Sequence, residues 1–136
     1  MKIVLDTNIF ISGIFFSGPP AQILRAWKDQ KIQIVLSKEI LNEYQRVAEE
    51  ISKKYSSVDI GPIIELLTIY GEIVETEGVS VTICEDPDDN IFLECAIASN
   101  SKVIVSGDKH LLKVSGYQDI EVVTPRNFAD SFLELR

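Results

Sequence analysis

The chain has 136 residues, of which 46% are hydrophobic and 25% are charged. These proportions are ordinary for a globular protein of common domain size, so we expect one domain over residues 1–136. An uncharged run at residues 9–22 is too short, and too broken by Gly and Pro, to cross a bilayer. The amino terminus also lacks the cleavage pattern of a signal peptide, which favours a cytoplasmic location and no membrane partner.

The net charge of −8 is unusual for a protein that binds nucleic acid, because such proteins normally present a basic face. Acidity can simply serve solubility, but clustered acids can also hold cations, which reverses their charge locally. The two cysteines, Cys84 and Cys95, form no CxxC pair and have no His placed to complete a zinc set. We therefore expect two reduced, largely buried thiols.

The first half of the chain alternates between strand and helix patterns. In chain order we expect a strand, two helices, a strand, two helices and a strand at residues 2–5, 7–13, 19–29, 32–36, 38–55, 57–70 and 73–74. The first strand ends abruptly at Asp6-Thr7-Asn8, residue types that favour helix starts and turns. Prolines at 19 and 20 open the second helix, Ser37 caps the third, and Gly71 ends the fourth.

The second half continues the alternation after an uninformative stretch at residues 78–85. Asp86-Pro87-Asp88-Asp89 predicts a helix start. We then expect a strand, a short helix, a strand and a final helix at residues 103–105, 111–112, 120–123 and from Thr124-Pro125 through Phe128, Phe132 and Leu135. This alternation predicts an α/β fold in three layers, with a central parallel β-sheet flanked by helices on both faces.

Two of the expected strands end in an acid. Asp6 follows the strand at 2–5, and Asp108 follows the strand at 103–105. Ligands bind outside the carboxyl ends of the strands in an open parallel sheet, so these carboxylates indicate a shared site. Each Asp alone could instead act as a helix cap, because Asp is common at strand-to-helix turns.

Further acids are available to join this site. Glu43 lies near the start of the third helix, at the border of its apolar face, and could equally face solvent. Asp86, Asp88 and Asp89 begin a helix, where the helix dipole already favours acids. Asp89 differs because Leu93 follows it at i+4 and another apolar residue at i+7, which places it along the buried stripe. A carboxylate there needs a base or a metal as its partner.

The sequence offers these acids no good basic partner. His110 is the single histidine, and its place two residues after Asp108 indicates a surface or supporting residue. Catalysis by a Ser-His-Asp or Cys-His arrangement is therefore disfavoured. Converging carboxylates either rise in pKa or bind a hard cation, and oxygen ligands favour Mg²⁺ or Mn²⁺. Hydrolysis of phosphodiester bonds is the natural chemistry of such a site.

Four segments together resemble a known family: Val-Leu-Asp-Thr-Asn at 4–8, Ser-Lys-Glu-Ile-Leu-Asn-Glu-Tyr at 37–44, Asp-Pro-Asp-Asp-Asn at 86–90 and Val-Ser-Gly-Asp-Lys-His-Leu-Leu at 105–112. They resemble the PIN domain, and within it the toxin components of bacterial and archaeal toxin–antitoxin systems, the VapC-like ribonucleases. The resemblance covers nearly the whole chain, in the order and spacing of the family.

The resemblance implies a ribonuclease that depends on Mg²⁺ or Mn²⁺. The catalytic and metal-binding acids of the family fall on Asp6, Glu43, Asp89 and Asp108. The supporting positions fall on Asn8, Ser106 and Asp88, of which Asp88 is also an alternative to Asp89. The resemblance further implies an RNA substrate, a small antitoxin protein as partner, and pairing into a homodimer. Surface bases near the motifs are candidates for RNA contacts: Lys38, Arg46, Lys109 and Lys113.

Two alternatives remain open. A phosphatase of the haloacid-dehalogenase type needs a second Asp two residues after the first, and position 8 is Asn. A catalytically inert PIN-fold binding module would have no need to retain the acids at all four positions. Metal-dependent cleavage of RNA, compared with hydrolysis of a small phosphate ester, separates these functions.

Overall fold

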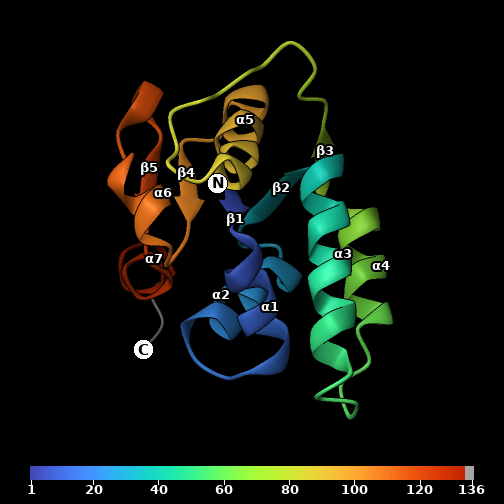
Figure 1. The fold of residues 1–136 in the computed structure, drawn as a ribbon. Coiled ribbons are helices and arrows are strands. Elements are labelled where there is room, and N and C mark those ends of the chain that lie inside the picture. The colour runs from blue at the N-terminus through green and yellow to red at the C-terminus, as the bar shows by residue number, and fades with distance from the viewer. Residues whose placement is uncertain (134–136) are drawn as a thin grey trace.

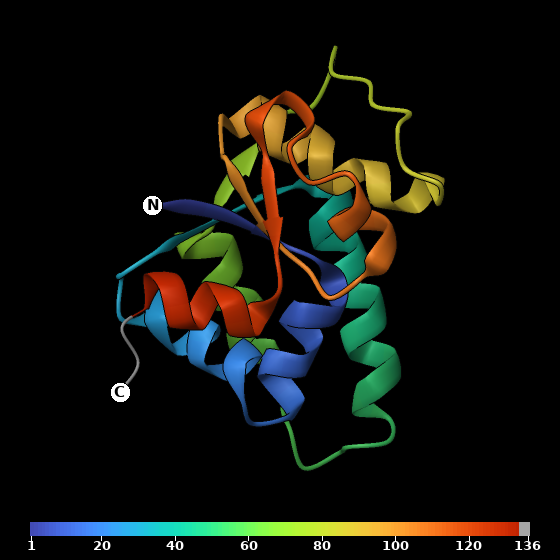
Figure 2. The same ribbon diagram turned by 90° about the vertical axis from the view of Figure 1, so that its left-hand side faces the viewer.

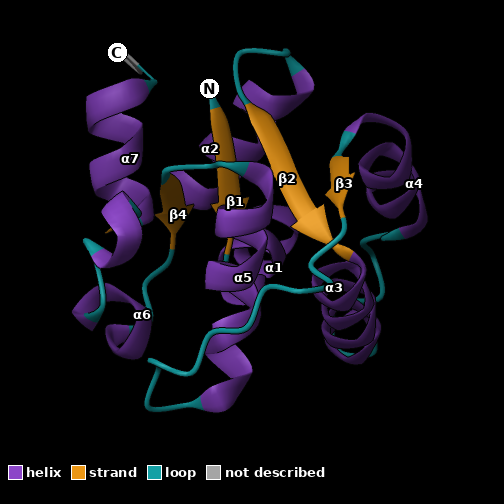
Figure 3. Cartoon of the chain, turned by 90° about the horizontal axis from the view of Figure 1, so that it is seen from above, coloured by secondary structure: helices purple, strands orange, loops and turns teal. Residues whose placement is uncertain are grey.

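A computed structural model describes residues 1–133 of the chain. Five strands form one sheet in the order β3-β2-β1-β4-β5, and every neighbouring pair is parallel. The strands are β1 (Lys2–Leu5), β2 (Gln33–Ser37), β3 (Glu72–Val74), β4 (Val103–Val105) and β5 (Glu121–Val123). Figure 3 shows the common direction of β1, β2, β3 and β4, and β5 is parallel to β4, so the carboxyl ends of the strands meet at one edge of the sheet.

Seven α-helices connect the strands within the described residues. They are α1 (Thr7–Phe15), α2 (Pro19–Lys28), α3 (Lys38–Ser52), α4 (Gly61–Tyr70), α5 (Asn90–Ser99), α6 (Lys109–Lys113) and α7 (Pro125–Phe132). Single 3-10 turns occur at η1 (Pro87–Asp89) and η2 (Tyr117–Asp119). Figure 1 shows α4 lying beside α3, and Figure 2 shows α5 on one face of the sheet with α1, α2 and α7 on the other. The predicted three-layer α/β fold is therefore confirmed.

The core follows from the short apolar runs of the central strands. Residues 3–5, 34–36 and 103–105 are all buried. Strands covered by helices on both faces need such continuous apolar runs, because neither face meets water. None of the helices described in residues 1–133 is long and apolar enough to span a membrane. Cys84 and Cys95 are both buried and unpaired, as expected.

Tyr44 ties three elements of the fold together close to the carboxyl edge of the sheet. Its hydroxyl donates a hydrogen bond to the Leu5 carbonyl at the end of β1. Its ring stacks on Phe10 of α1, with 4.2 Å between ring centroids and 11° between ring planes. Burial raises the pKa of the Tyr44 hydroxyl well above its usual value, so this hydroxyl keeps its proton and remains a donor.

The largest difference from the predicted elements concerns the segment between α3 and α4. The third helix was predicted to reach Tyr55 but ends at Ser52, and the fourth was predicted to begin at Ser57 but begins at Gly61. The reason is local turn chemistry, because the Asp59 carboxylate accepts a hydrogen bond from the Gly61 N–H at 3.0 Å.

Smaller differences concern the boundaries of other elements. Strand β2 lies one residue later than predicted, and α1 continues two residues further, to Phe15. No helix or strand forms at residues 78–85, where the sequence pattern was uninformative. The final helix was expected to carry Leu135, which lies outside the described residues.

Candidate metal centre

Asp6 and Ser106 meet where the two central strands end. Leu5 of β1 pairs with Val105 of β4, and the Asp6 N–H donates to the Val105 carbonyl at 3.0 Å. The next residue of each strand therefore lies at the same level of the sheet. The Ser106 hydroxyl donates to Asp6 Oδ2 at 2.6 Å, and both side chains are buried. Asp6 of the motif at 4–8 and Ser106 of the motif at 105–112 are thus in direct contact.

Asp108 joins this pair through the backbone. Its N–H donates to Ser106 Oγ at 2.9 Å, so the serine links the two acids. Asp108 Oδ1 also accepts a hydrogen bond from the His110 N–H at 2.8 Å and caps α6. The helix-cap interpretation is therefore correct for Asp108. It does not hold for Asp6, whose side chain forms no capping hydrogen bond to α1.

Asp89 comes to the site from the helix layer that contains α5, whereas Asp6 and Asp108 follow strands of the sheet. It precedes α5, the helix that covers the other face of the sheet, and its side chain is only 7% exposed. Asp89 Oδ2 is buried without a hydrogen-bond partner among the described residues. A buried carboxylate oxygen without a donor is costly, so this atom is a candidate ligand for a cation.

The electrostatics of the three aspartates are unfavourable without a cation. Burial, followed by the nearby charges of Asp108 and Asp6, raises the pKa of Asp89 from 3.8 to about 7. Burial also raises the pKa of Asp6, and Asp108 adds to that effect, whereas the Ser106 hydroxyl lowers it. The site therefore holds negative charge that the described protein groups do not neutralise.

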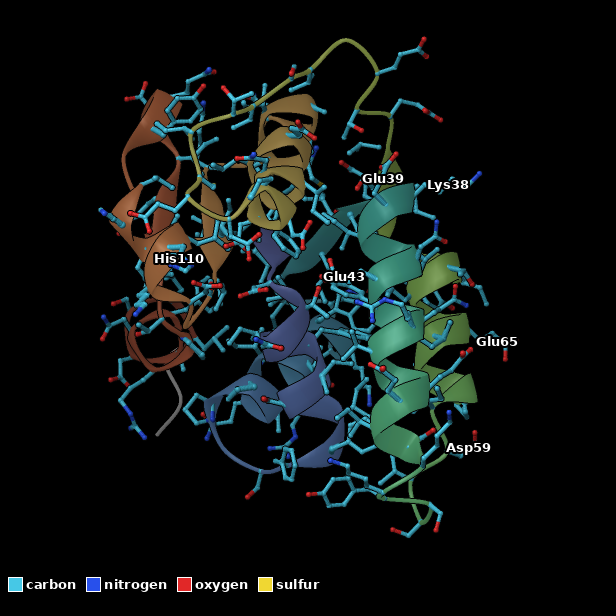
Figure 4. All side chains as sticks on the ribbon, viewed as in Figure 1. Lys38, Glu39, Glu43, Asp59, Glu65 and His110 are labelled. Atoms are coloured by element: carbon cyan, nitrogen blue, oxygen red, sulfur yellow. The ribbon has the colours of Figure 1, made fainter. Side chains whose placement is uncertain are left out.

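Glu43 lies at the rim, on the side of α3 that is turned toward α1 (Figure 4). Partial burial raises its pKa, and the charges of Asp6 and Asp88 add to the shift. The Thr7 hydroxyl and the Arg46 guanidinium lower that pKa, with Arg46 Nη2 lying 3.9 Å from Glu43 Oε1. Thr7 Oγ1 is buried without a hydrogen bond of ordinary geometry among residues 1–133, so its influence on Glu43 is that of a nearby dipole.

The closest group of potential metal ligands is not the same as the four predicted acids. One ligand atom each from Asp89, Asp108 and His110 lies within 4.8 Å of the others. Asp6 connects to Asp108 of this group through Ser106, whereas Glu43 is influenced by Asp6 and Asp88 and lies on the opposite side of the view from His110 (Figure 4). Sequence reasoning gave His110 only a surface or supporting position. The available signal was its place two residues after Asp108 in the first turn of α6.

Of the three predicted supporting residues, Ser106 contacts the acids, whereas Asn8 and Asp88 are exposed. Ser106 contacts both Asp6 and Asp108, as described above. Asn8 is exposed. Asp88 is exposed as well, and its N–H donates to Asp86 Oδ1 at 3.0 Å. Burial thus distinguishes Asp89 from Asp88, in line with the packing pattern of the sequence.

A divalent cation fits the residues present. The group of candidate ligands contains two carboxylates and one imidazole, and Asp89 also has a buried oxygen that lacks a partner among residues 1–133. Hard divalent cations take carboxylate oxygens, and transition ions of the first row also accept imidazole. Asp89 and Asp108 would hold the ion, with Asp6 and the His110 ring beside them.

The comparisons with known proteins agree with this geometry. The PIN domain family matches residues 2–110, which include β1, β4 and all four predicted acids. The chain therefore belongs to the PIN domain family. It is also 29% identical to the uncharacterized protein MJ1680 of Methanocaldococcus jannaschii, over 97% of this chain and 92% of that protein. PIN domains are generally nucleases, and they typically use a divalent metal.

Proposed function

We propose that this protein is a Mg²⁺- or Mn²⁺-dependent endoribonuclease and the toxin of a toxin–antitoxin pair. The observation that carries the nuclease proposal is the unpartnered, buried Asp89 Oδ2 beside Asp108, at the carboxyl edge of a PIN-domain sheet. Structural carboxylates normally have hydrogen-bond or ionic partners, so a buried one without either favours a role in binding a cation.

The four acids take different parts in this proposal. When bound, the ion supplies charge neutralisation and Lewis-acid polarisation of the scissile phosphodiester. Asp89 and Asp108 hold it, and Ser106 keeps Asp6 aligned beside them. Glu43 is part-buried with a raised pKa, which suits its carboxylate to accept a proton from the attacking water. Hydrolysis then adds that water across one P–O bond of the RNA backbone.

The basic residues near the site support an RNA substrate unequally. Arg46 is engaged with Glu43 and Glu50, and Lys113 with Glu85. Lys109 is exposed and forms no ion pair within the described part of the chain, so it remains available to phosphates. Lys38 is also exposed and without an ion pair there, but its side chain points outward, away from Glu43 and His110 (Figure 4). Binding through few cations predicts weak affinity with a shallow dependence on salt.

The nuclease proposal is tested by cleavage of a labelled single-stranded RNA in Mn²⁺, in Mg²⁺ and in chelator. Wild-type protein should cleave internally with metal and not in chelator, and Asp6→Asn should lose at least a hundredfold in rate. Asp130→Asn is the matched control, because Asp130 is an exposed acid on α7. RNA binding without cleavage would support an inert binding module, and hydrolysis of p-nitrophenyl phosphate alone would support a phosphatase.

The toxin role needs a separate experiment. A small antitoxin is expected to cover the acidic centre with an Arg or Lys, because guanidinium contacts carboxylates in a bidentate manner. Affinity-tagged protein purified from its native host should carry such a partner, and expression of the chain alone should arrest growth. Harmless expression and no small partner would contradict the toxin role and leave the nuclease role standing.

Two further features are part of the proposal. Ile69 and Tyr70 of α4 and Ile73 of edge strand β3 are large apolar residues that are exposed, and a homodimer would cover such residues. Sedimentation at micromolar concentration tests this pairing. The expected location is the cytoplasm, where the RNA substrate and the divalent ions are both present.

A further inference from the structure

His110 lies between two carboxylates at the edge of the metal centre. Its Nδ1 is 3.4 Å from Asp108 Oδ1, and its Nε2 is 3.4 Å from Glu85 Oε2. Asp108 belongs to the proposed metal centre, whereas Glu85 lies outside it in the segment before η1. The imidazole therefore bridges the site and a loop that the mechanism above does not use.

The outer carboxylate is fixed in place by a second contact. Lys113 Nζ donates to Glu85 Oε1 at 2.7 Å, which leaves Oε2 for the imidazole. Lys113 lies one turn after His110 on α6, so one short helix supplies both partners of Glu85. This arrangement holds the ring in a defined orientation at the surface.

The two ring nitrogens of a neutral imidazole cannot both donate. When the ring proton is on Nε2, which lies 3.4 Å from Glu85 Oε2, Nδ1 carries the lone pair, and Nδ1 lies 3.4 Å from Asp108 Oδ1. A lone pair facing carboxylates is repelled unless a cation lies between them. Metal-binding histidines typically donate their other N–H to a carboxylate, which fixes the tautomer and the ring orientation.

An independent observation points to the same place. Asp89 is 7% exposed, its Oδ2 lacks a hydrogen-bond partner among residues 1–133, and a carboxylate oxygen of Asp89 lies within 4.8 Å of the ligand atoms of Asp108 and His110. One oxygen from each aspartate and one ring nitrogen thus lie close together, and Asp89 also has a buried oxygen without a partner among the described residues.

We propose that His110 is a nitrogen ligand of this centre, oriented by Glu85, and that the centre takes a first-row transition ion such as Mn²⁺ in preference to Mg²⁺. Imidazole binds first-row transition ions well, whereas Mg²⁺ favours oxygen ligands and retains several waters. The inference builds on the proposed metal-dependent function and narrows the choice of ion. It adds a residue that the four-acid set does not contain.

The test measures metal binding without RNA, by calorimetric titration of the full chain with MnCl₂ and with MgCl₂. His110→Gln should raise the Kd for Mn²⁺ about 10- to 100-fold and change the Kd for Mg²⁺ less than about threefold. Glu85→Gln should shift the ratio of the two Kd values in the same direction by about tenfold. The ratio is the readout, because loss of a nearby negative charge alone weakens both ions together.

The chain contains one histidine, so a spectroscopic signal from an imidazole nitrogen bound to the metal can be assigned to His110. Pulsed EPR of the Mn²⁺-loaded protein should show coupling to one directly bound ¹⁴N, and His110→Gln should abolish it. Glu85 is an exposed side chain, so Glu85→Gln keeps the test valid if the His110 variant folds poorly.

The outcomes separate this inference from the function on which it rests. An unchanged Kd ratio in both variants, or no ¹⁴N coupling in the wild type, would overturn the role of His110 even if the protein cleaves RNA. A preference for Mn²⁺ over Mg²⁺ that falls in both variants would support it even if no RNA is cleaved.

Discussion

The amino and carboxyl ends of the sheet differ in their cavities and in their charged groups. At the amino ends of β1 and β2, a cavity of about 570 Å³ is lined by Met1, Trp27, Lys28, Tyr70 and their neighbours. At the carboxyl ends lies the acidic centre of Asp6, Asp89 and Asp108. The amino-end cavity is lined by no acidic side chain and by none of the carboxylates with raised pKa.

This contrast shows that electrostatic frustration identifies the site better than volume does. The amino-end cavity is lined by the aromatic rings of Trp27 and Tyr70, by aliphatic groups and by lysines that extend into water, and none of these groups needs a buried ionic partner. The carboxyl end places acids together and buries one of them without a partner. A group of carboxylates with raised pKa values indicates a functional site more directly than the volume of a cavity does.

The largest expected effect is a difference in RNA cleavage between a substitution at the carboxyl end of the sheet and one at the amino end. Asp89→Asn should lower the rate of RNA cleavage in Mn²⁺ by at least a hundredfold, because it removes the buried ligand that needs the cation. Tyr70→Ala at the amino-end cavity should leave the rate within about twofold. Initial rates on one labelled RNA, measured with both variants at equal concentration, make the comparison. Equal losses in both variants would remove the distinction between the ends.

A second effect concerns stability in the presence of metal. An ion that binds only the folded protein stabilises it by about 2.7 kcal/mol at a hundredfold excess over Kd. For a chain of this size the melting temperature should rise by roughly 10 °C. Asp89→Asn should show a higher melting temperature in chelator, because repulsion is relieved, and almost no response to Mn²⁺. Tyr70→Ala should respond to Mn²⁺ as the wild type does, and a wild-type melt that ignores Mn²⁺ would contradict the metal centre.

A third effect is the pH dependence of the metal-free protein. The pKa of Asp89 is raised from 3.8 to about 7 in the folded state, so its contribution to stability is fully present below pH 4 and is lost as pH rises through 7. Unfolding in urea should therefore need about 1–2 kcal/mol less at pH 8 than at pH 5. Asp6 and Glu43 are shifted in the same direction and add to the loss.

The control for this pH dependence is Asp89→Asn, which should flatten the profile over the same interval. Mn²⁺ should reverse the trend in the wild type, because ligands bind the ion only after they lose their protons. Stability that rises from pH 5 to pH 8 in chelator would show that Asp89 has a cationic partner.

The smallest effect compares two buried serines at opposite ends of β4. Ser106 Oγ donates to Asp6 at the carboxyl end, and Ser101 Oγ donates to the Lys2 carbonyl at 2.9 Å at the amino end. Substitution of either serine by Ala should cost about 1 kcal/mol of stability. Only Ser106→Ala should also weaken Mn²⁺ binding, by about tenfold, because Asp6 loses its alignment. A similar loss of affinity in Ser101→Ala would indicate a general effect of packing.

The elements that the sequence predicted well are those with strong local signals. The buried runs of β1 and β4, together with the acids that end them, were enough to predict that Asp6 and Asp108 lie at one edge of the sheet. The apolar spacing after Asp89 also predicted its burial correctly. In each case the residue and its structural signal are close together in the sequence.

The features that were missed depend on partners far away in the sequence or on side-chain turn chemistry. His110 is held by Glu85, 25 positions earlier by their numbers, so neither residue signals the contact by itself. The start of α4 depends on one hydrogen bond from Gly61 to Asp59, which propensity does not reveal. The unpaired oxygen of Asp89 could not be predicted without the packing of α5 against the sheet.

The hydrogen bond from Tyr44 to the Leu5 carbonyl has a kinetic consequence. It joins α3 to the last residue of β1, so the separation of Glu43 and Asp6 is set when the chain folds. Helix α3, which carries the proposed proton acceptor Glu43, is therefore already positioned against β1 before an ion binds. Ion entry should therefore follow a single exponential in stopped-flow mixing, with a rate that increases linearly with ion concentration and reaches no plateau from a prior rearrangement.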